Sequence, residues 1–218
     1  RGLGDVYKRQ AERERSVGLG VMGFHSFLQK KRIPLESVMA KSWNKKIFKQ
    51  IDEQVNKASK DLAEERGAFG VYDYEKEAGH PFVERLFRED PELQVLHQTH
   101  GRRNIALTTT APCGSVSMLT QTTSGIEPPF MLSYTRRKKI NPDDPTAKVD
   151  FEDDLGDKWQ NFTVYHHGLK KWMDITGLED ETLSPYAGST ANEINWEAAV
   201  DLQAAAQNWV CHAISKTI

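Results

Sequence analysis

The sequence is poor in cysteine, in long apolar runs and in excess charge of either sign. Its 218 residues include two cysteines, Cys113 and Cys211, too few for a disulfide framework or a four-thiolate zinc site, which favours a reducing compartment. Lysine and arginine number 29 against 31 acidic residues, and a formal charge of -2 gives no reason to expect binding to DNA or an anionic membrane. No apolar run approaches the roughly 20 residues that span a bilayer. We therefore expect a cytoplasmic protein without membrane or direct DNA contacts.

Both ends of the sequence look artificial. Residues 1–10 begin without Met, fit no amphipathic pattern and resemble translated linker sequence, so we expect the folded domain to comprise residues 11–218. Residues 213–218 have the pattern of a strand that is cut off, because no turn or cap follows it. The sequence predicts one partial domain that is truncated at both ends.

Hydrophobic periodicity predicts a helix-rich α/β fold. Apolar residues at helical spacing predict helices over residues 12–32, 38–67, 81–88, 164–176 and 196–211. Asn195 is the expected N-cap of the last of these. The clearest pattern is in the second, where one stripe holds Val38, Trp43, Ile47, Ile51, Val55, Ala58 and Leu62.

Two further segments have the composition of strands. A β-branched run over 104–110 predicts a buried strand, and residues 131–140 predict another, followed by turn residues 141–145 that open an acidic surface excursion. Long helices between isolated strands predict a parallel arrangement with helical crossovers.

Gly18, Gly20 and Gly23 match the dinucleotide-binding pattern G-x-G-x-x-G. A nicotinamide-dependent dehydrogenase is therefore one alternative. That fingerprint needs a buried strand directly before the first glycine, whereas residues 12–16 contain four charged residues. We favour the interpretation that these glycines allow close helix packing.

Residues 111–117 have the composition of an anion-binding loop. Pro112 ends the predicted strand, Gly114 lets backbone approach a ligand, and Ser115 and Ser117 are small enough to leave N–H and hydroxyl donors accessible to phosphate oxygens. From spacing alone, an ordinary tight turn rich in serine and glycine is an equally good interpretation.

Residues 112–115, followed by Gly-Ile-Glu-Pro at 125–128, resemble the paired signature of the ribonucleotide reductase catalytic subunit. Segments 15–23 and 214–218 extend the likeness, which covers nearly everything from residue 13 to 218. The resemblance implies an α/β barrel of ten strands in two half-barrels. This chain would supply a helix-rich, incomplete part of the C-terminal half-barrel.

The resemblance also implies a reaction. The family reduces the 2'-hydroxyl of ribonucleoside di- or triphosphates by thiyl-radical chemistry, with a thioredoxin-type reductant, and the parent enzyme is expected to be a homodimer. Neither Cys113 nor Cys211 lies in the context of the radical cysteine, so we predict no catalytic residue in this chain and no activity from it alone.

The same resemblance implies the site residues. Substrate phosphates are expected on the loop, largely through backbone N–H groups of Cys113, Gly114, Ser115, Val116 and Ser117. Many relatives have Thr where this chain has Cys113, and a thiol is a weaker donor. The residues expected to shape the loop are Pro112, Gly125, Glu127 and Pro128.

Segments 111–118, 136–142 and 164–167 resemble the adenosylcobalamin-dependent members most. The alternative is the class that uses a separate radical-generating subunit. The histidine pairs 97/100 and 166/167 fit no closed set of metal ligands, and we predict no metal site.

Overall fold

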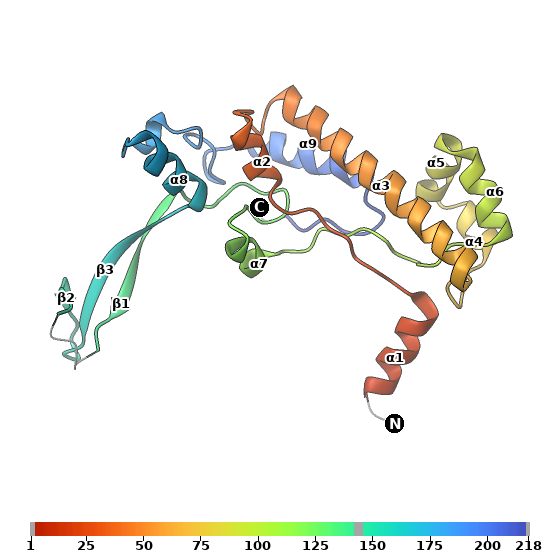
Figure 1. The fold of residues 1–218 in the computed structure, drawn as a ribbon, viewed down its shortest axis with the longest axis horizontal. Coiled ribbons are helices and arrows are strands. Elements are labelled where there is room, and N and C mark those ends of the chain that lie inside the picture. The colour runs from red at the N-terminus through yellow and green to blue at the C-terminus, as the bar shows by residue number, and fades with distance from the viewer. Residues whose placement is uncertain (1–2, 142–145, 217–218) are drawn as a thin grey trace.

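The computed structural model describes residues 3–141 and 146–216, which form a helix-rich body with one projecting β-hairpin (Figure 1). The helices are α1 (Leu3–Glu14), α2 (Phe24–Lys30), α3 (Val38–Arg66), α4 (Tyr74–Ala78), α5 (Pro81–Glu89), α6 (Pro91–Thr99), α7 (Gly114–Leu119), α8 (His167–Thr176) and α9 (Trp196–Gln207), with a short 3-10 helix η1 (Glu181–Leu183). The strands are β1 (Ser133–Lys139), β2 (Phe151–Glu152) and β3 (Lys158–Tyr165). The helices predicted over 38–67 and 81–88 are confirmed, while those over 164–176 and 196–211 begin or end several residues inside the predicted bounds.

Helix α3 is the longest helix and begins at a side-chain cap, where Ser37 Oγ accepts the N–H of Ala40 at 3.1 Å. Its most buried line lies beside the apolar stripe seen in the sequence and is largely polar: Ala40, Asn44, Phe48, Asp52, Asn56, Ser59 and Ala63. Two of its polar members have hydrogen-bond partners on other segments, since Asn44 donates to the carbonyl of Leu202 at 2.9 Å and Ser59 to Asn104 at 2.9 Å. Val38, at the start of the predicted stripe, is 85% exposed.

Helix α9 runs along α3 and closes the main apolar core (Figure 1). Asn195 is its N-cap, as predicted, and accepts the N–H of Glu197 at 2.8 Å. The buried members of this core are Phe24, Leu28, Leu35, Ala40, Phe48, Ile126, Leu202, Ala206, Trp209, Val210 and Ile214. Burial of so many large side chains between α2, α3 and α9 makes this the most stable part of the body.

The helix predicted over residues 12–32 is wrong in its middle. Helix α1 ends at Glu14, Arg15 adopts a positive φ of 51°, and α2 begins only after Gly23, whose φ is 79°. Between the helices, the N–H groups of Val17 and Leu19 donate to the carbonyls of Ala106 and Leu107 at 3.0 and 2.9 Å. Pairing with a distant segment therefore overrides the local helical spacing.

The buried extended segment predicted at 104–110 lies at the centre of the body. It has parallel bridges on both sides, Leu19 with Thr108 and Thr110 with Ile214. The contacts are isolated bridges rather than a continuous ladder, so the parallel arrangement predicted from the sequence is present only in this short form. It brings three segments that are far apart in the chain side by side.

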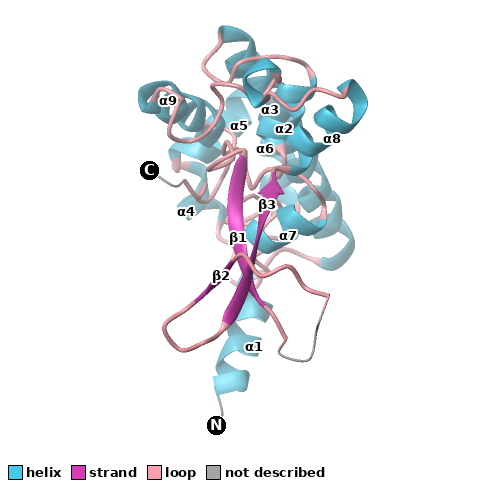
Figure 2. Cartoon of the chain, turned by 90° about the vertical axis from the view of Figure 1, so that its left-hand side faces the viewer, coloured by secondary structure: helices cyan, strands magenta, loops and turns pink. Residues whose placement is uncertain are grey.

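The regular sheet, by contrast, is antiparallel and has the order β1-β3-β2. Strand β1 confirms the strand predicted over 131–140 and pairs with β3 from Ser133 opposite Tyr165 to Lys139 opposite Trp159. Figure 2 shows this hairpin extending away from the helices. Of the predicted turn 141–145, residues 142–145 lie outside the described residues, and the described residues of the excursion over 146–157 are exposed or half-buried.

Helices α5 and α6 form a smaller core with Val83, Leu86, Phe87 and Leu93. Arg85 joins it to α3 through a 2.8 Å ion pair with Asp52, which is 2% exposed. Burial raises the pKa of Asp52, against the opposing effect of Arg85. None of the helices in the described part of the chain is both long and apolar enough to span a bilayer. Residues 3–10 are helical, and the assignment of residues 1–10 to linker sequence stays a prediction.

Candidate functional site

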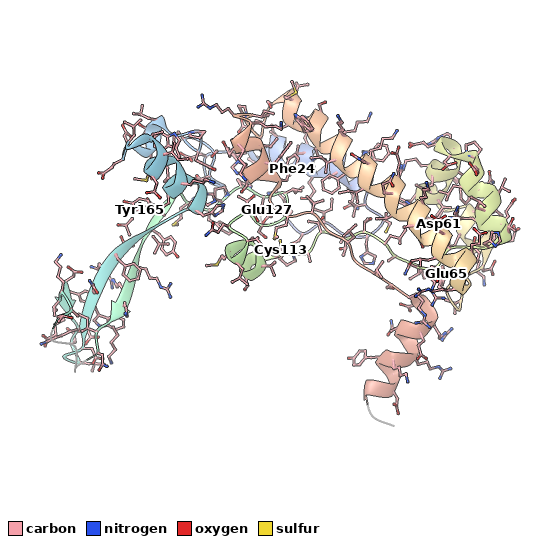
Figure 3. The ribbon with its side chains drawn as sticks, viewed as in Figure 1. Phe24, Asp61, Glu65, Cys113, Glu127 and Tyr165 are labelled. Carbon is pink, nitrogen blue, oxygen red and sulfur yellow. The ribbon has the colours of Figure 1, made fainter. Side chains whose placement is uncertain are left out.

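The loop singled out by the sequence lies where the central extended segment ends and α7 begins. Figure 3 shows Cys113 beside α7, with Glu127 close by. Cys113 is the N-cap residue of α7, with φ of -114°, and its side chain caps nothing. The extended segment therefore ends in a turn at the start of α7, where the first backbone N–H groups have no partner within the helix.

Of the five residues expected to bind phosphate, two have their N–H groups engaged within the chain. The N–H of Cys113 donates to Ser124 Oγ at 3.2 Å, and that of Ser117 donates to the carbonyl of Cys113 at 2.8 Å. No described residue accepts from the N–H groups of Gly114, Ser115 and Val116. All three residues are exposed, so these N–H groups are the free donors of the loop.

The side chains of Cys113 and Ser117 also point to internal partners. Cys113 Sγ accepts the N–H of Gly125 at 3.3 Å and lies 3.5 Å from Ser124 Oγ. Ser117 is 5% exposed, and its hydroxyl donates to the carbonyl of Gly114 at 2.8 Å. These two side chains hold the loop in shape and leave the accessible donors to the backbone.

The second motif packs directly against the loop. Gly125 is buried with φ of 50°, and its carbonyl accepts the N–H of Phe24 at 3.3 Å. The Glu127 carboxylate lies 3.8 Å from Lys216 Nζ, and both side chains are largely buried. The pair ties the loop to the segment that follows α9, which agrees with a loop-shaping role for Glu127. Lys216 is a partner that the sequence alone did not indicate, because it is 89 positions away in the chain.

The glycines of the dinucleotide-like pattern serve backbone packing. A Cβ at Gly20 would lie 2.4 Å from the carbonyl oxygen of Thr109, and one at Gly18 would lie 2.6 Å from Thr109 Cγ2. Close packing at these glycines is confirmed, but the prediction that a helix packs there is wrong, because Gly18 and Gly20 lie in an extended segment against the extended segment that contains Thr109. The dehydrogenase alternative is wrong, because α1 and not a strand precedes these glycines, and the neighbouring residues Val17 and Leu19 pair with residues 106–109.

Of the histidines noted in the sequence, His97 is buried, while His100, His166 and His167 are half-buried. His97 is 1% exposed with its ring edge-on to Phe87, and burial, with the nearby charge of Arg102, lowers the pKa of His97 to about 4. The ring centroids of His166 and His167 are 4.0 Å apart, and burial lowers the pKa of His166 to about 4. Within residues 3–141 and 146–216, no group of three or more His, Cys, Asp or Glu is placed to hold a metal ion.

Parallel-paired extended segments, flanking helices and a donor-rich loop at the end of the central segment define a piece of an α/β-barrel enzyme. The model of the family "Ribonucleotide reductase, barrel domain" matches residues 5–218, and the chain belongs to this family. The predicted partial barrel of ribonucleotide reductase is thereby confirmed.

Named relatives agree with this assignment. The chain is 30% identical over 218 residues to the vitamin B12-dependent ribonucleoside-diphosphate reductase of Thermoplasma acidophilum, covering 97% of this chain and 25% of that protein. It is 35% identical over 126 residues to the protein of the same name from Mycobacterium tuberculosis, covering 58% of this chain and 16% of that one. The chain thus spans a quarter or less of these relatives, and their names agree with the predicted likeness to adenosylcobalamin-dependent members.

A solved structure shows the same fold. The class Id ribonucleotide reductase alpha subunit of Actinobacillus ureae matches with a TM-score of 0.56 and 22% identity, over 93% of this chain and 32% of that one. At this identity the match supports the fold alone.

Proposed function

We propose that this chain is part of a ribonucleotide reductase that converts ribonucleotides to 2'-deoxyribonucleotides, and that its loop binds the substrate phosphates. The observation that carries the proposal is the row of free N–H groups at Gly114, Ser115 and Val116, exposed at the end of the central segment. Successive backbone N–H groups that point the same way suit an anion with several oxygens. Cys113 and Ser117 position these donors rather than contact phosphate with their side chains.

Gly114 allows a sharp test, because a Cβ there would meet no atom within 4 Å. A Gly114→Leu variant adds bulk beside the free donors without a clash inside the fold. We expect cytidine diphosphate, but not cytidine, to protect the amides of residues 114–118 from hydrogen exchange, and we expect Gly114→Leu to abolish this protection. Gly79→Leu, at a second glycine with open space around it, is the matched control.

Unchanged exchange at residues 114–118 in the presence of cytidine diphosphate would contradict the phosphate assignment. We further expect no deoxyribonucleotide formation by the chain alone, which an assay of the purified chain with a dithiol reductant checks directly.

Adenosylcobalamin dependence of the longer enzyme rests on the names of the relatives. The cavity beside Glu127 and Pro128 has a volume of about 210 Å³, below the roughly 300 Å³ at which small-molecule sites begin. This cavity is too small for a corrin, and we assign none of the residues of this chain to the cofactor. The expected result is that a full-length enzyme containing this chain is inactive without added adenosylcobalamin. Activity that needs a second subunit instead would place it in the class with a separate radical-generating subunit.

The remaining partners follow from the same proposal. A thioredoxin-type dithiol would restore the reduced enzyme after each turnover, and the parent enzyme would be a homodimer. Cys113 and Cys211 take no part in this exchange. Cys211 Sγ accepts the N–H groups of Leu107 and Thr108 at 3.2 Å each, which is a structural contact within the body.

A further inference from the structure

A cavity of about 350 Å³ lies between the end of α2, helix α8 and the loop that follows η1. Gln29 and Arg32 line it from the α2 side, Trp172 from α8, and Gly188 from the loop. Its volume is within the range of roughly 300 to 1,000 Å³ that is usual for small-molecule sites. No residue of the phosphate loop lines it, so it is a separate feature of the body.

Two opposite charges line this cavity without pairing with each other. Arg32 and Glu36 are both exposed at the rim of the cavity, and neither forms an ion pair with a residue in the part of the chain that the structure describes. Glu36 is held in place because its Oε1 accepts the N–H of Asn195 at 2.5 Å. Arg32 has a positive φ of 55°, which is uncommon for a residue with a side chain.

The floor of the cavity adds an acceptor on a largely buried residue. Gln29 is 4% exposed, and its amide nitrogen lies 2.9 Å from Nε2 of His25. No donor among the described residues reaches the amide oxygen of Gln29, and this oxygen is not among the buried polar atoms that lack a partner. It is therefore open to solvent from the cavity, where a ligand that donates a hydrogen bond can take the place of water.

The remaining wall of the cavity is apolar. Trp172 presents a half-buried ring, and the other apolar lining residues include Ile33, Pro34, Leu35, Leu183, Pro185 and Ile194. A ligand that carried only an anion would face Glu36 unpaired, and one that carried only a cation would face Arg32 unpaired. The lining therefore fits a small molecule that carries a positive and a negative charge and also has an apolar part.

We propose that this cavity binds a small zwitterion of the α-amino acid class with an apolar side chain. Its carboxylate pairs with Arg32, its ammonium group lies between Glu36 and the amide oxygen of Gln29, and its side chain packs on Trp172. The proposal does not depend on the phosphate loop.

The test uses the whole chain and three probes: L-phenylalanine, phenethylamine, which keeps only the ammonium group, and 3-phenylpropionate, which keeps only the carboxylate. Titration followed by saturation-transfer NMR is expected to show saturable binding of L-phenylalanine and about tenfold weaker binding of each analogue, the usual loss for one charge-assisted contact. Failure of L-phenylalanine to bind, or equally tight binding of either analogue, would overturn the proposal.

Variants then locate the site. Arg32→Gln and Glu36→Gln are each expected to weaken L-phenylalanine about tenfold. The matched controls Arg88→Gln and Glu84→Gln change exposed charges on α5, outside the cavity, and should bind as the unaltered chain does. Unchanged affinity in both cavity variants would overturn the assignment. The analogue series is decisive even if a variant does not fold, because it uses the unaltered chain.

Discussion

The central extended segment at 104–110 and the β1–β3 hairpin find partners for their backbone hydrogen bonds in opposite ways. The central segment is surrounded by helices, makes only isolated bridges, and finds its partners about 90 residues before it and about 100 residues after it. The hairpin pairs with its own neighbour in seven successive positions, yet neither of its faces is buried. In this molecule, regular strand pairing therefore joins segments that are neighbours in the sequence. The stability of the fold depends instead on the burial of side chains around the less regular central segment.

The most direct test of this difference in stability is to truncate one phenylalanine side chain in each region. Phe48 on α3 is 2% exposed in the main core, whereas Phe162 on β3 is 40% exposed. We expect Phe48→Ala to lower the free energy of unfolding by about 4 kcal/mol and Phe162→Ala by less than about 0.5 kcal/mol. Urea denaturation of both variants measures the difference. Equal losses would show that the hairpin carries stability that its exposure does not reveal.

Glycines give a second, smaller contrast. Gly20→Ala would push a Cβ into the carbonyl of Thr109, so we expect it to cost about 3 kcal/mol. Gly156→Ala, near the tip of the hairpin, meets nothing closer than 3.8 Å, and only its positive φ of 80° opposes the change, at about 1 kcal/mol. Thermal unfolding of the two variants should show the larger fall in Tm for Gly20→Ala. The reverse order would mean that residues 17–20 can separate from 106–110 without loss of the fold.

We expect acid to lower the stability of the helical body but not that of the hairpin. Burial lowers the pKa of His25 and His97 to about 4 from 6.5, and no histidine lies in β1, β2 or β3. A lowered folded-state pKa means that the unfolded chain binds protons first, so this stabilisation is complete above pH 6.5 and is lost as the pH falls toward 4. We expect a loss of about 1 kcal/mol for each of these histidines between pH 7 and 5.5. Amides of the body should then exchange faster at pH 5.5, relative to the intrinsic rate, than at pH 7.

Replacing His97 would show how much of this acid sensitivity comes from one histidine. Both of its ring nitrogens are buried without a hydrogen-bond partner among the described residues. His97→Leu should therefore keep the packing against Phe87 and reduce the loss of stability between pH 7 and 5.5 by about 1 kcal/mol. His100→Leu, three positions along, controls for removal of an imidazole. An unchanged acid response in His97→Leu would show that another group carries the effect.

The sequence predicted the helices better than their buried faces. Periodicity located α3 to within a residue at each end, yet its most buried line includes Asn44, Asp52 and Ser59, whose partners come from distant segments. Such partners leave no local signal. The helix predicted through residues 15–23 failed for the same reason, because its apolar spacing competes with backbone pairing to residues 106–110.

The loop that we propose to bind phosphate was singled out in the sequence by composition and by family likeness. Composition could not separate its accessible donors from its structural ones. Cys113 and Ser117 have the same kinds of polar group as their neighbours, and only the position of Ser124 and of the Gly114 carbonyl shows that they are engaged. Lys216, opposite Glu127, lies too far along the chain for any spacing argument to find it.

The bridges Leu19–Thr108 and Thr110–Ile214 also dictate the order in which the chain can fold. A hairpin such as β1–β3 closes in roughly 1 to 10 μs, whereas contacts between ends separated by about a hundred residues must first overcome a larger loop-closure entropy. Because the second bridge needs Ile214, a ribosome must release about a hundred further residues after the central segment before that segment gains its last partner. High contact order at its centre should make this domain fold slowly, with strand edges that are exposed to aggregation until residue 214 has been released.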